Sequence, residues 1–221
     1  MTQLGSTAAA MRMDEAPLMF DLSMNEVEMT AYKAARGAGL PWGLAEDAGR
    51  AARWLARAGF DWSTSLLSML SAGAGEMTSP FALAAEVTDV LLATGGARPA
   101  SNPPAIGHAR VMQPLWAVPV IAHAAHGLHA VRIMIGADTM ITDGDRVWAT
   151  CSLTHMGSIP WAYVLVETIT SQEPPLAHLW QPTATRSLIP EANYVALEAL
   201  VYRTYVPTSE KSRLRGAGGR P

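Results

Sequence analysis

The hydrophobic pattern of this 221-residue chain changes near residue 100, and that change constrains the fold more than any other feature. Before it, apolar residues recur at spacings of three and four, which is typical of amphipathic helices. After it, β-branched and aromatic residues are interrupted by Pro and Gly, which is typical of strands and turns. Pro99, Pro103 and Pro104 form a stiff connector between the two parts. Because the predicted strands follow one another without intervening helices, the pattern favours an α+β fold with a mostly antiparallel sheet.

The first part of the chain predicts helices. Ser23 and Glu26 fit a capping box, which starts the first helix, and the stretch from Gly37 to Pro41 ends it. The second helix covers 44–58, and its short connection to the first predicts a helical hairpin with small residues between the two backbones. The other helices predicted here cover 64–71 and 80–93.

The second part of the chain predicts strands, with Asp143-Gly144 as a hairpin signal between two of them. A long helix is predicted after the last strand, over 187–205, and Val206-Pro207 ends it. The predicted strands cover 115–122, 130–135, 139–142, 146–151 and 163–170.

We expect one domain over residues 23–207, in which an N-terminal helical layer packs on the sheet. Its helical part covers 23–96 and its β-rich part 108–170, and the long C-terminal helix completes it. Residues 1–22 have no sustained period and are expected to form a flexible leader. Residues 208–221 are expected to form a Gly-rich, basic tail that is too polar to pack alone.

Charge and cysteine content predict the cellular setting. Sixteen Lys and Arg face nineteen Asp and Glu, and the net charge of −3 lacks the basic footprint of a nucleic-acid binder. Residues 208–221 hold four basic residues and one acid, so the body carries a charge of −6 and the tail +3. The lone Cys151 cannot form an internal disulfide, and neither a secretory signal nor an apolar stretch of membrane length is recognisable. We therefore expect a soluble, cytoplasmic protein without nucleic-acid or membrane partners.

Three histidines, His123, His126 and His129, form an H-x2-H-x2-H pattern that invites a metal interpretation. On a strand, the middle residue points away from the other two, and on a helix the three spread over a wide arc. No cysteine or acidic residue lies close in sequence to complete a coordination shell. The pattern therefore predicts polar residues at a strand end and its turn, and no metal site is expected here or elsewhere.

Cys151 and His155 could act as a thiolate nucleophile and its base. The alternative is that Cys151, which shares strand parity with Val147 and Ala149, packs in the core as a small hydrophobe.

Asp138 and Asp143, with Asp145 nearby, could provide a carboxylate pair for acid and base catalysis, although turn chemistry alone explains Asp143 before Gly144. The chain contains no G-x-S-x-G, P-loop, H-E-x-x-H or G-x-G-x-x-G motif. We expect no cofactor, and the sequence leaves open whether the protein is an enzyme.

Two segments carry a resemblance to a known family. SMNEVEMTAYKAARGAGLPWGLAEDAGRAARWLA, residues 23–56, and TYVPTSEKSRLRGAG, residues 204–218, resemble the bacterial family DUF3726, a domain of unknown function. Within these segments, the motif most specific to the family is G-x2-W-G followed by A-E-[DE]-A-G. The resemblance implies a shared fold and carries no reaction across. This chain departs from the family pattern by its extension before Ser23 and by a tail that stops soon after Gly219.

The same segments suggest a ligand site, because polar and aromatic residues stand at helix ends and in Gly-rich turns, where backbone N–H groups can meet an anion. If the Gly-rich tail folds back over the turn from Gly37 to Gly43, it could close on a small acidic or phosphorylated ligand at that turn. The alternative is that Trp42 covers the core, Arg36 and Glu46 are solvated and the tail is disordered. The candidate ligand-binding residues are Arg36, Trp42, Glu46, Ser209 and Arg213.

Two functions remain open. The first is a cytosolic enzyme or binding protein for a small anionic metabolite, which requires a concave site. The second is a non-catalytic accessory or assembly subunit, which could form a homo-oligomer. This function requires a flat exposed apolar patch.

Overall fold

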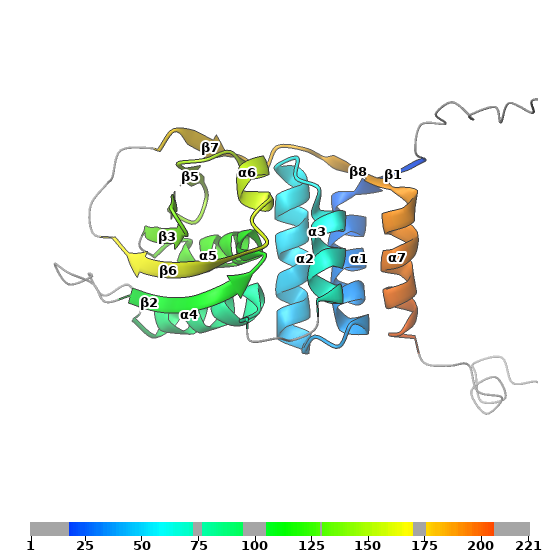
Figure 1. Ribbon diagram of the computed structural model, residues 1–221, viewed down its shortest axis with the longest axis horizontal. Coiled ribbons are helices and arrows are strands. Elements are labelled where there is room, and N and C mark those ends of the chain that lie inside the picture. The colour runs from blue at the N-terminus through cyan, green and yellow to red at the C-terminus, as the bar shows by residue number, and fades with distance from the viewer. Residues whose placement is uncertain (1–17, 73–76, 95–104, 129, 170–175, 206–221) are drawn as a thin grey trace, which may run out of the picture.

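The computed structural model describes residues 18–72, 77–94, 105–128, 130–169 and 176–205, and its elements are labelled in Figure 1. The helices are α1 (Met24–Gly37), α2 (Trp42–Arg57), α3 (Trp62–Ser71), α4 (Pro80–Thr94), the short 3-10 helix η1 (Pro114–Trp116), α5 (Ala117–Ala125), α6 (Leu153–Gly157) and α7 (Glu191–Tyr202). The strands are β1 (Met19–Ser23), β2 (Ala105–Met112), β3 (Val131–Ile135), β4 (Asp138–Thr142), β5 (Val147–Ala149), β6 (Trp161–Thr168), β7 (His178–Trp180) and β8 (Arg186–Pro190).

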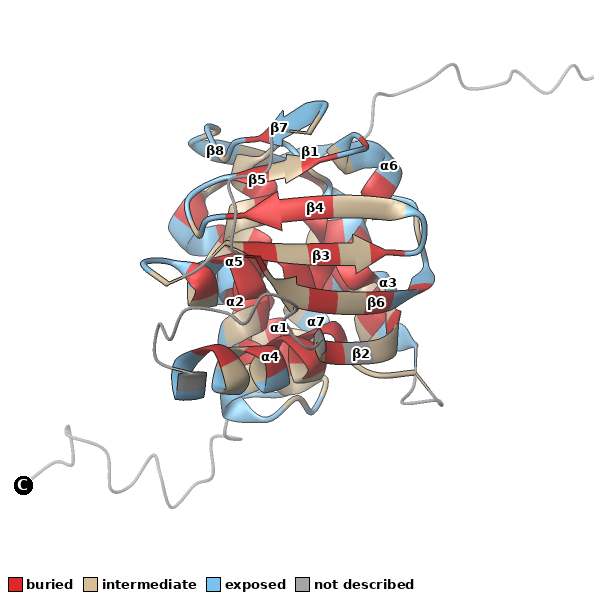
Figure 2. Ribbon diagram, turned by 90° about the vertical axis from the view of Figure 1, so that its left-hand side faces the viewer, coloured by how far each residue is buried: buried red, intermediate tan, exposed pale blue. Residues whose placement is uncertain are grey.

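The strands of the described residues form two antiparallel sheets. The larger has six strands in the order β2-β6-β3-β4-β5-β7, and the smaller pairs β1 with β8. Figure 2 looks onto the larger sheet, with helices behind it. The predicted α+β class with an antiparallel sheet is confirmed.

The helices form more than one layer. α4 and α5 pack against each other and contact the larger sheet, whereas α1 lies between α2 and α7, farther from it (Figure 1). The expected helical layer on the sheet is thus made chiefly of α4 and α5. Buried residues from all these helices and from the sheet form one continuous hydrophobic cluster.

The predicted hairpin of α1 and α2 is confirmed, and its capping box is present. The Ser23 N–H donates to Glu26 Oε2 at 2.7 Å, and the Glu26 N–H donates to Ser23 Oγ at 3.3 Å. Alanines face one another between the helices and are fully buried. Gly49 permits the close approach, because a Cβ there would lie 2.9 Å from the Glu28 carbonyl oxygen. The small residues therefore set the distance between the two helices.

The strand predicted over 115–122 is wrong, because this stretch is η1 followed by α5. Its side chains are buried on all sides, and a continuous apolar run does not distinguish a buried strand from a buried helix. Pro119 is compatible with the helix because it lies in the first turn of α5, where its missing N–H has no helical acceptor to lose.

Strand β8 changes the expected C-terminal boundaries. Residues 186–190 pair with β1 in the register Met19↔Pro190, so the last helix has 12 residues and is shorter than the predicted 187–205. The same pairing places residues 19–22, expected in the leader, in β1. Residues 1–17 and the tail 208–221 lie outside the described residues. The prediction also missed β2, α6 and β7.

None of the helices in the described ranges has the length and apolar character needed to cross a membrane.

Candidate functional site

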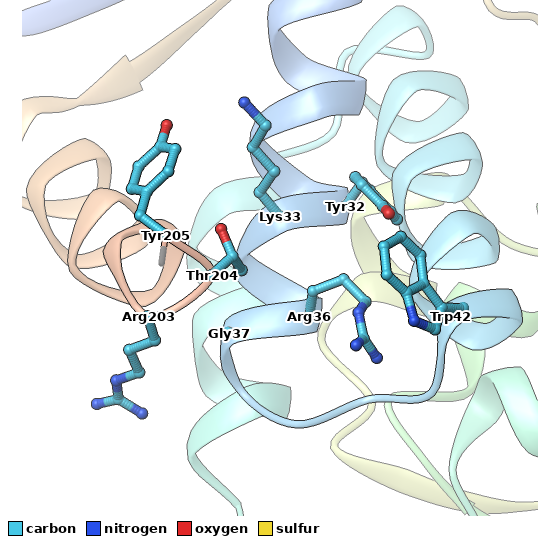
Figure 3. A pocket seen from close by; sticks show the side chains of 8 residues that line it. All are labelled: Tyr32, Lys33, Arg36, Gly37, Trp42, Arg203, Thr204 and Tyr205. Carbon is cyan, nitrogen blue, oxygen red and sulfur yellow. The ribbon is translucent and has the colours of Figure 1, made fainter. Parts of the chain in front are cut away.

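A pocket of about 450 Å³ lies where the C-terminal ends of α1 and α7 meet the start of α2 (Figure 3). Three of its side chains are cationic, and within the described residues its lining holds no carboxylate. We call it the basic pocket. It is lined by Tyr32, Lys33, Arg36, Gly37, Trp42, Arg203, Thr204 and Tyr205.

The turn between α1 and α2 positions Arg36 and Trp42. Gly39 has a φ of +100°, which lets the chain leave α1 sharply, and α2 begins at Trp42 directly after Pro41. The Arg36 guanidinium consequently lies 4.5 Å from the centre of the Trp42 ring. Its Nη1 also donates a hydrogen bond to the Leu40 carbonyl oxygen. Arg36 is thus held from two sides.

The remaining wall comes from the end of α7. Gly37 makes this possible, because a Cβ there would lie 1.8 Å from the carbonyl oxygen of Leu200. Residues 203–205 therefore approach α1, and Lys33 Nζ lies 5.9 Å from the centre of the Tyr205 ring. Figure 3 shows the side chains of Tyr205 and Thr204 on one side of α1 and Trp42 on the other.

The start of α2 adds polar groups beside Arg36. The first N–H groups of an α-helix lack intrahelical acceptors, and Pro41 offers no side chain to cap them. At Gly43, apart from its chain neighbours and the backbone of its own helix, no atom lies within 4 Å of the position that a Cβ would take, so this first turn is open. Cations and free N–H groups together favour an anion here.

The structure brings together two of the five predicted ligand-binding residues. Arg36 and Trp42 both line the basic pocket, and Trp42 is 65% exposed, so it does not cover the core as the alternative required. Glu46 lies one turn further along α2, is exposed and does not line the pocket. Ser209 and Arg213 lie outside the described residues.

Sequence reasoning missed five of the six other lining residues; the sixth, Gly37, was expected to end the first helix and to begin the turn at which the ligand site was predicted. Lys33 precedes Arg36 by three positions, and this i,i+3 spacing could have identified it. Residues 203–205 come from the other end of the chain, and no local pattern connects them to α1.

A second constellation unites three of the four candidate catalytic residues. Asp138 starts β4, Cys151 follows β5, and His155 lies in α6. One ligating atom from each, a carboxylate oxygen, the thiol sulfur and a ring nitrogen, all lie within 4.8 Å of one another. His155 Nε2 is 3.3 Å from Asp138 Oδ2. We call these residues the Asp–Cys–His cluster.

The electrostatics of this cluster disfavour a thiolate at neutral pH. Burial raises the pKa of the Cys151 thiol to about 11, and the Asp138 charge and a hydrogen bond to Asp138 act in the same direction. The predicted thiol and base are therefore neighbours, but the thiol stays protonated at neutral pH as long as no metal ion takes the place of its proton. Within the part of the chain that the structure describes, the Asp–Cys–His cluster offers the donor atoms that a metal ion would need.

The other predicted candidates have local roles. Asp143 Oδ1 accepts from the N–H groups of Asp145 and Arg146, as its turn position predicts. Asp145 faces His126, with 3.1 Å between Oδ1 and Nδ1. His123 and His126 are exposed at the end of α5, a helix rather than the predicted strand, and His129 lies outside the described residues.

Comparison with known proteins identifies one related family. Residues 22–97 match the family model DUF3726, described as a protein of unknown function. The match confirms the resemblance predicted from residues 23–56, and it covers α1 to α4 and the turn that carries Arg36 and Trp42. No curated protein and no solved structure matches the chain.

Proposed function

We propose that this chain, whose residues 22–97 match DUF3726, binds a small anionic metabolite in the basic pocket. One observation carries the proposal. Three cationic side chains and no carboxylate line the described part of the pocket, although the chain as a whole has a net charge of −3. Such a local excess of positive charge attracts anions and raises the rate at which they associate.

The arrangement of Arg36 indicates what the ligand carries. A guanidinium has five N–H donors in a plane, and the stack on Trp42 and the bond to Leu40 fix that plane while leaving other donors free. A carboxylate or phosphate would meet these donors without a large entropic cost of ordering. The exposed ring of Trp42 offers a flat apolar surface beside the charge. The pocket volume also lies within the range of metabolite sites.

The tail extends this proposal. Tyr205 lines the pocket, and the basic segment 208–221 follows it within three residues. Ser209 and Arg213 are therefore close enough in sequence to close over a bound anion. We place this binding function in a bacterial cytoplasm, on the sequence grounds of the lone Cys151 and the DUF3726 resemblance.

A thermal-shift screen with small carboxylates and phosphates tests the proposal, because a ligand that binds the native state raises its melting temperature. We expect at least one anion to raise the Tm of the wild type, and the Arg36→Gln variant to lose that shift. The matched control is Arg146→Gln, which removes an exposed arginine that also lies over a tryptophan, at 5.9 Å from Trp148. Deleting residues 208–221 should weaken the response.

A second candidate function, the assembly subunit, is supported by the outer face of the larger sheet. Alternate residues of β6 and a residue of β7 share this face, and among them Trp161, Tyr163 and Leu179 are exposed. A second copy of the chain would bury them in a homodimer. Light scattering after size exclusion would then give twice the mass of 23.5 kDa, and Trp161→Lys would return the monomer.

A further inference from the structure

We propose that the Asp–Cys–His cluster binds a zinc ion through Asp138 Oδ2, Cys151 Sγ and His155 Nε2, with a fourth coordination position open to solvent. This site is separate from the basic pocket, and the proposal does not depend on the proposed function.

The donor atoms suit zinc in type and spacing. Zinc accepts sulfur, imidazole nitrogen and carboxylate oxygen, whereas magnesium and calcium prefer oxygen alone. In a tetrahedral site, bonds of about 2.0–2.2 Å place a nitrogen and an oxygen ligand roughly 3.4 Å apart. His155 Nε2 and Asp138 Oδ2 are 3.3 Å apart. The Cys151 sulfur, one carboxylate oxygen of Asp138 and one ring nitrogen of His155 all lie within 4.8 Å of one another.

Hydrogen bonds orient the carboxylate. Thr150 Oγ1 donates to Asp138 Oδ1 at 3.0 Å, which leaves Oδ2 directed toward His155. Thr150 is itself held, since its Oγ1 accepts from the Thr139 N–H at 3.1 Å and its own N–H donates to the Thr139 carbonyl oxygen at 2.9 Å. Such outer partners fix the ligands of metal sites. The β4–β5 pair therefore presents Asp138 in a defined orientation.

The backbone of the other two ligands is fixed as well. Trp180 Nε1 donates to the Cys151 carbonyl oxygen at 3.2 Å, and the Ser152 side chain caps α6 by accepting from the His155 N–H at 3.2 Å. The fully buried Met156 anchors α6 to the core. The backbones of Cys151 and His155 are therefore held in fixed positions relative to each other.

Exposure gives the site one closed side and one open side. Cys151 is 9% exposed, while the side chains of Asp138 and His155 are 20% and 58% exposed. Zinc could enter past His155, and the fourth position would face water. Three protein ligands and an open position characterise zinc sites that bind a water or a further ligand, whereas structural sites have four protein ligands.

Titration of metal-free full-length protein with Zn²⁺ and Co²⁺, in separate experiments, tests the proposal. We expect one equivalent of Zn²⁺ by calorimetry, and a sulfur-to-cobalt charge-transfer absorption with Co²⁺. Asp138→Asn and Cys151→Ser should each weaken Zn²⁺ binding by about 100-fold or more, and Thr150→Val by roughly 10-fold. His126→Gln, at an exposed histidine that also faces an aspartate, is the matched control and should bind as the wild type does.

Thermal unfolding of each metal-free variant shows whether it folds, so that a lost site is distinguished from a lost fold. Less than a tenth of an equivalent of bound Zn²⁺ would overturn the proposal. Co²⁺ binding without a thiolate signal would also overturn it, as would an unchanged Zn²⁺ affinity in a folded Cys151→Ser variant. Either result would show that Cys151 is not a ligand.

Discussion

The Arg36 guanidinium lies 4.5 Å from the centre of the Trp42 ring, across the turn that joins α1 to α2. The two residues are six positions apart, and the turn brings them together before any ligand is present. A cation held against an aromatic ring in this way keeps its charge but loses freedom of movement. The geometry of Arg36, in addition to its charge, should therefore matter for binding.

Replacing Arg36 by Lys tests this distinction. Arg36→Lys keeps the positive charge but loses the planar donors and the stack on Trp42. We expect the anion found by the thermal-shift screen to bind roughly 10-fold more weakly, which corresponds to about 1.4 kcal/mol. Calorimetry measures the difference, and Arg146→Lys serves as the control. Equal affinities of Arg36→Lys and wild type would show that charge alone suffices.

Substitution at Gly37 should loosen the packing of α7. A Cβ at this position would lie 1.8 Å from the Leu200 carbonyl oxygen, and a backbone atom cannot move aside cheaply. We expect Gly37→Ala to lower the free energy of unfolding by about 1–3 kcal/mol. Gly43→Ala is the matched control, because no atom beyond its chain neighbours and the backbone of its own helix lies within 4 Å of its Cβ position. Urea unfolding monitored by circular dichroism compares the two, and equal stabilities would contradict the close approach.

The capping box predicts a pH dependence at the start of α1. Hydrogen bonds that the Ser23 N–H and the Ser23 hydroxyl donate to the Glu26 carboxylate lower the pKa of Glu26 from its ordinary value of 4.5. A lowered carboxyl pKa contributes stability that is present above pH 4.5 and is lost as the pH falls through the folded-state value. The Glu26→Gln variant should therefore lose less free energy of unfolding than the wild type as the pH falls below 4.5. Ser23→Ala should cost about 1 kcal/mol at neutral pH. Denaturant titrations at several pH values measure both effects.

The Cys151 thiol should react slowly in the metal-free protein. With a pKa of about 11 against an ordinary 9.0, its thiolate fraction at pH 8 falls about 100-fold, while the more basic thiolate is intrinsically more nucleophilic. We expect iodoacetamide to label it at least about 10-fold more slowly than the urea-unfolded chain. Asp138→Asn removes the negative charge that, together with burial, raises the pKa of Cys151, so this variant should be labelled faster. Labelling of the native protein at the unfolded rate would instead support the nucleophile interpretation.

Local signals predicted the helical hairpin well. The Ser23 and Glu26 spacing, the Ala-rich faces and Gly39 act within a few residues, so the sequence displays them directly. The same holds for the β4–β5 turn, where Asp143 and a positive-φ Gly144 match the hairpin signal.

Signals that depend on distant residues were not predictable. The apolar stretch at 115–122 becomes a helix because neighbours surround it on every side, which its own sequence does not reveal. β1 and β8 stabilise each other although 160 or more residues separate them. Lys33 shares a helix with Arg36, but Tyr205 reaches the basic pocket through the packing of α7, and Asp138 meets Cys151 through strand pairing. Both candidate sites therefore combine one local motif with one tertiary contact.

The most direct measurement of the central claim is a titration of ¹⁵N-labelled protein with the screened anion, observed through the indole N–H signals of its seven tryptophans. Trp42 lies in the basic pocket, whereas Trp62, Trp116 and Trp180 are buried elsewhere, and Trp42→Phe assigns its signal. If the anion binds in the basic pocket, the Trp42 signal shifts until the site is saturated, while the signals of the three buried tryptophans stay in place. Saturable binding that leaves the Trp42 signal unchanged and moves another indole would contradict it.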